Sequence, residues 1–149
     1  MPIRPENRAR YPRDWPTISR TIRADAYNQC EWCGVRNYAL GAWIEGHWHA
    51  AEPKGSGSRD WPRQGERFPC RYRDHVEWAK VTRIVLTVAH LDHVPEHCDP
   101  ENLRALCQRC HNTYDMPMRR AGIAKRAREA LGVIDMFEAE QARPPAVAG

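Results

Sequence analysis

The sequence has no long hydrophobic run, which excludes several classes of protein. No apolar stretch approaches the roughly 20 residues that a helix needs to cross a bilayer, so we expect no membrane partner. The N-terminal segment, MPIRPENRAR, lacks the apolar centre of a secretion signal. We therefore expect a cytoplasmic protein. Thiols stay reduced there, and closely spaced cysteines serve as metal ligands or redox groups rather than as disulfides.

The sequence also has no internal repeat, and its 149 residues suit one domain of ordinary size. A formal net charge of +4 and a pI near 8.8 favour a polyanionic partner. The positive charge gathers in two arginine-rich stretches, residues 4–23 and 119–128, whereas residues 134–141 are acidic. The oligomeric state stays open.

The first half of the chain gives one clear helix signal. Asp14 and Pro16 suit the start of a helix over about residues 16–27, which would deliver the chain into the first cysteine pair. Residues 45–79 are rich in glycine, proline, tryptophan and charge and have no convincing periodicity. We interpret them as an insertion of loops, with room for a hairpin.

The clearest strand signal is VTRIVLTVAHL, residues 81–91, because the stretch is rich in β-branched residues. Pro95 and Pro100 then confine residues 92–101 to a loop.

A helical pattern begins at Leu106 and leads into a basic helix that runs to about residue 131, with Gly132 as its stop signal. We expect a single domain over residues 1–135, followed by a flexible tail at 136–149.

Four of the six cysteines form two identical C-x-x-C knuckles. Four thiolates at this spacing can close a tetrahedral zinc site, and zinc binding contributes directly to folding. The alternative is a redox pair, but a thioredoxin-like motif requires a βαβ context that is absent here. We predict a structural Zn²⁺ bound by Cys30, Cys33, Cys107 and Cys110, and we expect Cys70 and Cys98 to be ordinary thiols.

Residues 86–111, LTVAHLDHVPEHCDPENLRALCQRCH, hold four of the seven histidines. A strand ends in AHLDH, a loop with prolines leads to ENL, and a helix begins near LCQRCH, where His111 directly follows the second knuckle. This combination resembles the HNH endonucleases, especially the phage and bacterial subgroup in which two C-x-x-C knuckles frame the catalytic hairpin. The resemblance covers DWPTISRTIR, CEWCG and residues 81 to about 120.

The resemblance implies an α+β fold with a small ββα-metal core at about 81–120, stapled by the zinc site and flanked by helices. It also implies an endonuclease that hydrolyses DNA phosphodiester bonds, with double-stranded DNA as the expected partner. A histidine acts as general base on water in this family, and a single Mg²⁺ or Mn²⁺ ion stabilises the phosphate and the leaving oxygen.

Two site residues match the family pattern directly. Asn102 corresponds to the asparagine that hydrogen-bonds across the hairpin and positions the base. His111 corresponds to the metal ligand on the helix, whose backbone the adjacent zinc knuckle would fix.

Two registers are open for the base. In the favoured one His90 is the base, and Ala89 stands where the family has a metal ligand, so Asp92 becomes the candidate ligand. In the alternative, Asp92 and His93 are ligand and base, as in the phage Holliday-junction resolvases. Asp92 and His111 are the predicted ligands of the catalytic metal in both.

The basic helix offers phosphate contacts, although a solvated helix face explains its charge almost as well. The candidate DNA-binding residues are Arg119, Arg120, Lys125, Arg126 and Arg128. The rival function is a zinc-stabilised module that binds DNA or protein without cutting it, with a site that is degenerate at Ala89. Cleavage of RNA or branched DNA would use the same site.

Overall fold

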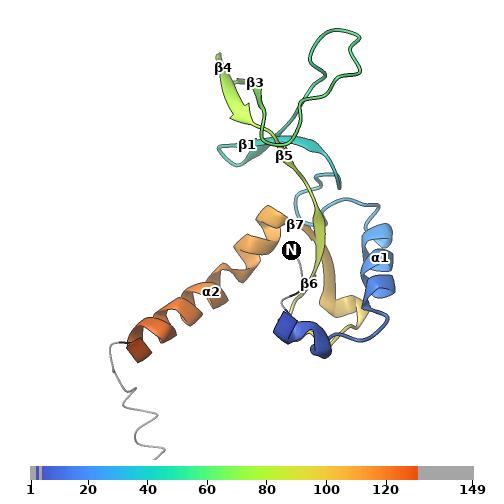
Figure 1. Cartoon of the computed structure of the whole chain (residues 1–149), viewed down its shortest axis with the longest axis vertical. Helices are drawn as coiled ribbons and strands as arrows, with labels where there is room; N and C mark the ends of the chain where they lie inside the picture. The colour runs from blue at the N-terminus through green and yellow to red at the C-terminus, as the bar shows by residue number, and fades with distance from the viewer. Residues whose placement is uncertain (1–2, 4, 131–149) are drawn as a thin grey trace, which may run out of the picture. The chain divides into compact units, whose positions relative to one another are not determined.

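The computed structural model describes residue 3 and residues 5–130, and it shows a mixed α+β protein with small sheets and two α-helices (Figure 1). The first compact unit of the chain ends at His111. The predicted end of the last helix at Gly132 and the predicted tail at 136–149 lie outside the described residues.

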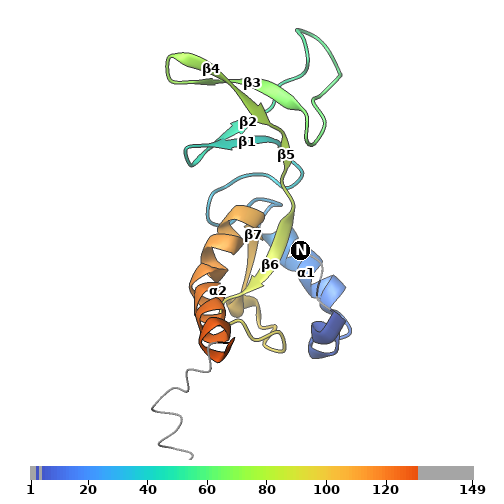
Figure 2. The same ribbon diagram turned by 60° about the vertical axis from the view of Figure 1, so that its left-hand side comes forward.

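The N-terminal segment contains the 3-10 helix η1 (Pro5–Arg10) and the helix α1 (Trp15–Asp25). Pro16 lies in the first turn of α1, where its missing N–H removes no helical hydrogen bond. Tyr27 then adopts a positive φ of 52°, which ends the helical path. The helix predicted over 16–27 is thus confirmed to within two residues at its C-terminal end. It packs against the hairpin that carries the histidine cluster (Figures 1 and 2).

A three-stranded sheet follows, with the strand order β2-β1-β5. It comprises β1 (Leu40–Ile44), β2 (His47–Ala50) and β5 (Thr82–Arg83). A Cβ atom on Gly41 would lie 2.2 Å from the carbonyl oxygen of His49, so only glycine permits this close pairing of β1 with β2.

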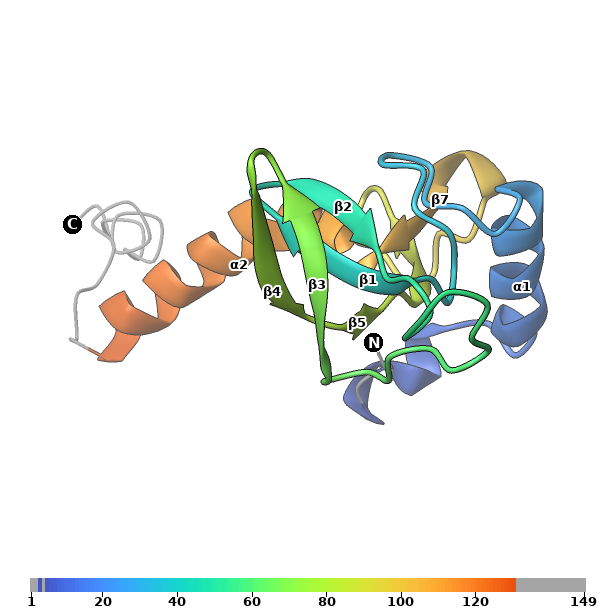
Figure 3. The same cartoon turned by 90° about the horizontal axis from the view of Figure 1, so that it is seen from above.

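The strands β3 (Arg67–Tyr72) and β4 (His75–Lys80) form an antiparallel hairpin (Figure 3). The stretch 45–79 therefore contains β2 and most of this hairpin, which is more regular structure than its composition indicated. Its strands are short, and only β3 alternates between exposed and buried residues, whereas β4 is exposed along almost its whole length. Frequent glycine, proline and charge obscure the alternation of β3 in the sequence.

The second antiparallel pair consists of β6 (Leu86–His90) and β7 (Leu103–Cys107). The strand predicted over 81–91 is divided between β5 and β6, which belong to different sheets. The intervening loop ends in the 3-10 helix η2 (Pro100–Asn102).

The helix α2 (Gln108–Ala130) begins two residues later than the helical pattern indicated. Leu106 and Cys107 still belong to β7, because they pair with Thr87 and Leu86 across the hairpin.

Two separate clusters of buried side chains stabilise the first unit. One joins both C-x-x-C knuckles to the β6–β7 hairpin and contains Cys30, Val35, Ile84, Leu86, Ala89, Leu106 and Cys107. The other belongs to the β1–β5 region and contains Ala42, Ile44, Ala51, Phe68, Cys70 and Val81. The inserted segment therefore packs, together with β1 and Val81, in a core separate from that of the cysteine knuckles. Neither helix in the described part of the chain combines the length and apolar character needed to span a bilayer.

Candidate metal centre and histidine site

The four predicted cysteines lie together. Their Sγ atoms are all within 4.8 Å of one another, and the Sγ atoms of Cys33 and Cys107 are 3.7 Å apart. Zn–S bonds of about 2.3 Å place the sulfur atoms of a tetrahedral site about 3.8 Å apart. A disulfide requires a much shorter S–S distance, about 2.05 Å. The predicted grouping of the cysteines is confirmed, and this cluster could hold a structural metal such as zinc.

Two tight backbone turns present the four thiols. In the first knuckle, the Gly34 amide donates to the Cys30 carbonyl at 2.8 Å, and Gly34 has a φ of +73° that glycine adopts easily. In the second, Cys107 ends β7 and Cys110 lies in the first turn of α2. The Cys110 amide donates to the Cys107 sulfur at 3.5 Å, which orients that sulfur toward the cluster.

Glu31, inside the first knuckle, attaches it to β7. The Glu31 amide donates to the Ala105 carbonyl at 3.0 Å, and the Ala105 amide donates to the Glu31 carboxylate. The two halves of the cysteine cluster are therefore held together by backbone contacts as well as by any metal.

The electrostatics of the cluster favour a bound cation. A hydrogen bond with the Cys107 thiol lowers the pKa of Cys30 to about 4, so one thiolate is stabilised by its neighbours. Burial and a hydrogen bond with Cys33 raise the pKa of Cys110 to about 12, and the hydrogen bond with Cys30 raises that of Cys107. Further negative charge is thus disfavoured without a cation, and a divalent metal would remove this penalty.

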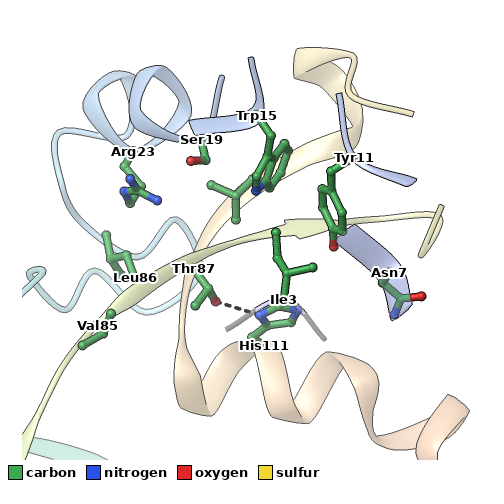
Figure 4. Close-up of a pocket in the computed structure, with 11 residues that line it drawn as sticks. Ile3, Asn7, Tyr11, Trp15, Ser19, Arg23, Val85, Leu86, Thr87 and His111 are labelled. Carbon is green, nitrogen blue, oxygen red and sulfur yellow. Dashed lines mark hydrogen bonds between the residues drawn. The ribbon is translucent and has the colours of Figure 1, made fainter. Parts of the chain in front are cut away.

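His111 follows Cys110 in the first turn of α2, and it faces β6. Its Nδ1 atom lies 2.7 Å from Oγ1 of Thr87, and the two side chains point toward each other (Figure 4). Figure 4 also shows the cleft beside them, which has a volume of about 580 Å³. Its walls include Trp15 and Arg23 from α1, and none of the described residues that line it is acidic. The cleft can therefore admit an anionic group next to His111.

Asn102 ties the two ends of the β6–β7 loop together. Its Oδ1 accepts from the Asp92 amide at 3.1 Å, and its Nδ2 donates to Asp92 Oδ1 at 2.9 Å and to the His97 carbonyl at 2.8 Å. Its backbone carbonyl accepts from the Leu91 amide at 2.8 Å. These hydrogen bonds join the end of β6 to the start of β7.

Asp92 also belongs to a chain of charged groups. The His97 ring lies between two carboxylates, with Nδ1 2.5 Å from Asp92 Oδ2 and Nε2 3.0 Å from Asp99 Oδ2. The hydrogen bond to Asp92 raises the pKa of His97. Hydrogen bonds from the Val94 amide, Asn102 and His97 hold the pKa of Asp92 far below its usual range. Asp92 is therefore a carboxylate that already has several donors.

His90 is buried, with only 8% of its surface exposed. Its ring stacks on Trp15 at a centroid distance of 5.0 Å and meets Tyr11 at 5.7 Å. Its Nε2 atom is 3.6 Å from the Cys98 sulfur. Burial lowers the pKa of His90, which favours the neutral form of its ring.

The N-terminal segment holds this aromatic cover in place. Arg10 makes a bidentate ion pair with Glu96 in the β6–β7 loop, at 2.7 and 2.9 Å.

His93, in contrast to His90, is only half-buried and lies at a sharp bend with a φ of 59°. The structure thus gives His93 better access to solvent than His90.

The predicted site residues are only partly brought together. The four cysteines form the single group of three or more metal-ligating side chains in the described part of the chain, so Asp92 and His111 do not complete such a group. The catalytic roles of His90, Asp92, His93, Asn102 and His111 stay predictions.

The basic residues of α2 surround the helix. Each residue of an α-helix is rotated by about 100° from the one before it. Arg119 and Arg126, seven positions apart, therefore share a face of α2, whereas the other three candidate residues lie on different faces. All five candidate cations are exposed, and Lys125 pairs weakly with Glu129 at 4.0 Å. This arrangement does not distinguish a DNA contact from a solvated helix.

Tyr11, Trp15, Thr87 and His97 were not expected at this site from the sequence. Their contacts join segments that are far apart in the chain or lie within an irregular loop, so no local spacing signals them.

Comparison with protein-family models, curated proteins and solved structures finds no match for this chain.

Proposed function

We propose that this protein is a metal-dependent endonuclease of the HNH type that hydrolyses DNA phosphodiester bonds. The supporting observation is the order β6, loop, β7, α2, in which Asn102 closes the loop and His111 lies on the first turn of the helix. This order is the one that the resemblance implies for a ββα-metal core, and the cysteine cluster at the β7–α2 junction would bind a structural Zn²⁺.

Phosphodiester hydrolysis requires a base that removes a proton from water. A neutral imidazole serves this purpose near pH 7. Mg²⁺ or Mn²⁺ at Asp92 and His111 would supply Lewis acidity to the phosphate and the departing 3′ oxygen. These two residues offer oxygen and nitrogen donors, which suit a weakly held divalent ion with positions left for water and phosphate.

The identity of the base depends on access to water. Burial favours the neutral form of His90, but Trp15 and Tyr11 cover its ring, so it meets water only if the N-terminal segment moves. His93 is next to Asp92 and half-exposed. The burial of His90 therefore favours the register in which Asp92 is the metal ligand and His93 is the base, although the sequence pattern favoured His90. In either register Asn102 fixes the backbone beside the base, and the cysteine cluster fixes that of His111.

A specific observation favours the rival function, a zinc-stabilised module that binds DNA or protein without cutting it. Ala89 stands where a metal ligand is expected in the His90 register, and it is 1% exposed inside the core. If His90 is only a packing residue as well, the hairpin has lost two functional positions.

Plasmid cleavage separates the two functions. The purified protein should nick or linearise plasmid DNA with added Mg²⁺ or Mn²⁺, and brief EDTA treatment should stop the reaction. His111→Ala should abolish cleavage while the bound zinc and the fold persist. No cleavage by a folded, zinc-bound protein that still binds DNA would reject the nuclease and leave the binding module.

A further inference from the structure

The β3–β4 hairpin has one face that the proposed catalytic core does not use. In the hairpin register Arg67 is paired with Lys80, Pro69 with Trp78 and Arg71 with Val76, so these six side chains share a face. All six are exposed, including 59% of Trp78 and 54% of Val76. The opposite face carries Phe68 and Cys70, which are buried in the second core. We call the exposed side the ribbon face.

The charge on the ribbon face has one sign. Arg67, Arg71 and Lys80 are its only ionisable residues, and none of them has an ion-pair partner among the described residues. Arg67 and Lys80 lie directly opposite each other, and like charges in that position destabilise a sheet. An anion bound across them would turn this repulsion into attraction. The pairing therefore points to a polyanionic ligand.

Trp78 occupies the middle of the ribbon face. Its rung lies between the Arg67–Lys80 rung and the Arg71 rung, each about 7 Å away along the strands. A large exposed aromatic side chain between cations offers a surface on which a base can stack while its flanking phosphates meet the charges. We propose that the ribbon face binds a nucleic-acid strand that carries unpaired bases.

The same features argue against two other occupants. A base in a duplex is already stacked and paired, so an exposed tryptophan gains little from it, and the cations alone would do the binding. A second copy of the chain packed face to face would bring three cations against three cations. An unpaired strand uses both the aromatic ring and the charges.

This inference deepens the proposed function, because it assigns the nuclease a substrate with a single-stranded stretch near the duplex that it cuts. Binding is nevertheless independent of cleavage, because the ribbon face lies outside β6, β7 and α2. It can be measured on the full-length protein without added Mg²⁺ or Mn²⁺, using the fluorescence anisotropy of a labelled oligothymidylate and of a duplex of the same length.

The first test removes the aromatic ring. Trp78→Ala should weaken oligothymidylate binding about 5- to 150-fold, the range that a stacked base contributes, and should change duplex binding much less. Trp61→Ala is the matched control, because Trp61 is 48% exposed in a loop outside the ribbon face. Equal effects of the two substitutions would overturn the proposal. An equal loss on duplex and single strand would overturn the assignment of an unpaired strand.

The second test removes the charges. The combined substitution Arg67→Gln, Arg71→Gln and Lys80→Gln should reduce the slope of log affinity against log salt by about 2, because each phosphate contact on a single strand contributes about 0.7. The control removes the same charge at three exposed arginines elsewhere: Arg13, Arg20 and Arg36. An equal change in both variants would overturn the proposal.

Two further results separate the occupants and the functions. Dimerisation in gel filtration that Trp78→Ala abolishes would replace the nucleic acid with a second copy of the chain. Loss of oligonucleotide binding in Trp78→Ala, together with no plasmid cleavage by the unmodified protein, would support the ribbon face and reject the nuclease.

Discussion

Thr87 orients the ring of His111. The Thr87 hydroxyl lies 2.7 Å from His111 Nδ1 and can donate to the Leu106 carbonyl at 3.4 Å. When the hydroxyl gives its one hydrogen to the Leu106 carbonyl, its oxygen can only accept a hydrogen bond from His111. His111 then carries its hydrogen on Nδ1, and the lone pair of the neutral ring is on Nε2. Metal-binding histidines are commonly fixed in this way by a hydrogen bond at the other ring nitrogen.

Thr87→Val should therefore weaken binding of the proposed catalytic metal. Valine keeps the shape of the side chain but cannot accept the Nδ1–H, so the ring loses its fixed orientation. We expect the Mg²⁺ or Mn²⁺ concentration for half-maximal cleavage to rise about 10- to 100-fold. Thr87→Ser keeps the hydroxyl and should stay close to the unmodified protein. Equal metal requirements for the valine and serine variants would show that Thr87 has no such role.

The cysteine cluster should hold one Zn²⁺ that the fold requires. Cys107 is completely buried where β7 meets α2, so Cys107→Ser should unfold or aggregate the protein. Cys70→Ala is the control, because Cys70 is buried in the other core and outside the cluster. It should retain zinc and fold. Metal analysis of purified samples gives the stoichiometry, and a well-folded protein without zinc would exclude the assignment.

The sequence predicted the parts of this structure that depend on local spacing. The two C-x-x-C knuckles, α1 and the position of Asn102 at the end of a loop each follow from residues that are close in the chain. The pairing of the knuckles also followed, because four thiols of identical spacing have one obvious common partner.

The parts that the sequence did not predict depend on packing between distant segments. Burial of His90 requires Tyr11 and Trp15, which precede it by more than 70 residues and have no pattern in common with it. The β3–β4 hairpin was obscured because β4 is exposed along almost its whole length and Pro69 interrupts β3 at an edge position. His97 lies in the predicted loop, but its contacts with Asp92 and Asp99 depend on how that loop folds back, which no local pattern shows.

The general base can be identified from the pH dependence of cleavage. Burial lowers the pKa of His90, so its basic form persists to lower pH than the ordinary imidazole value of about 6.5 allows. If His90 is the base, kcat/KM should rise with a midpoint below that value, and His90→Ala should abolish cleavage without loss of DNA binding. If His93 is the base, His93→Ala should abolish cleavage without loss of DNA binding, and His90→Ala should mainly disturb packing with Trp15.

The outcome of these two substitutions decides between the registers. Circular dichroism and zinc content provide the control for folding in both variants. Substantial cleavage by both would mean that neither histidine activates water, and the proposed mechanism would fail.

Asn102→Ala should loosen the β6–β7 loop. Its side chain makes hydrogen bonds to Asp92 and to the His97 carbonyl, and alanine leaves those groups without this partner. We expect a loss of about 1–3 kcal/mol in the free energy of unfolding, together with faster hydrogen exchange at the Asp92 amide. Cleavage should fall in parallel. Unchanged exchange with lost activity would instead indicate that Asn102 contacts the metal or the substrate directly.

The ion pairs of His97 should make the order of the loop depend on pH in both directions. The pKa of His97 is raised in the folded protein, so its contribution is complete below the unfolded value of about 6.5 and is lost as pH rises through the folded pKa. The pKa of Asp92 is lowered, so its contribution is present above about 3.9 and is lost as pH falls through the folded pKa. The loop should therefore be most ordered between about pH 4 and 6.5.

Hydrogen exchange at the Val94 amide reports this order, because that amide donates to Asp92 Oδ1 at 2.8 Å. Its protection, corrected for the intrinsic pH dependence of exchange, should decline at alkaline pH as His97 loses its proton. The decline should be small, because the His97 and Asp92 side chains are 48% and 35% exposed and solvent screens their interaction. His97→Gln should remove the alkaline decline and retain the acidic one. A His97 ring that titrates at or below the ordinary value, followed by NMR, would contradict the ion pairs on which this prediction depends.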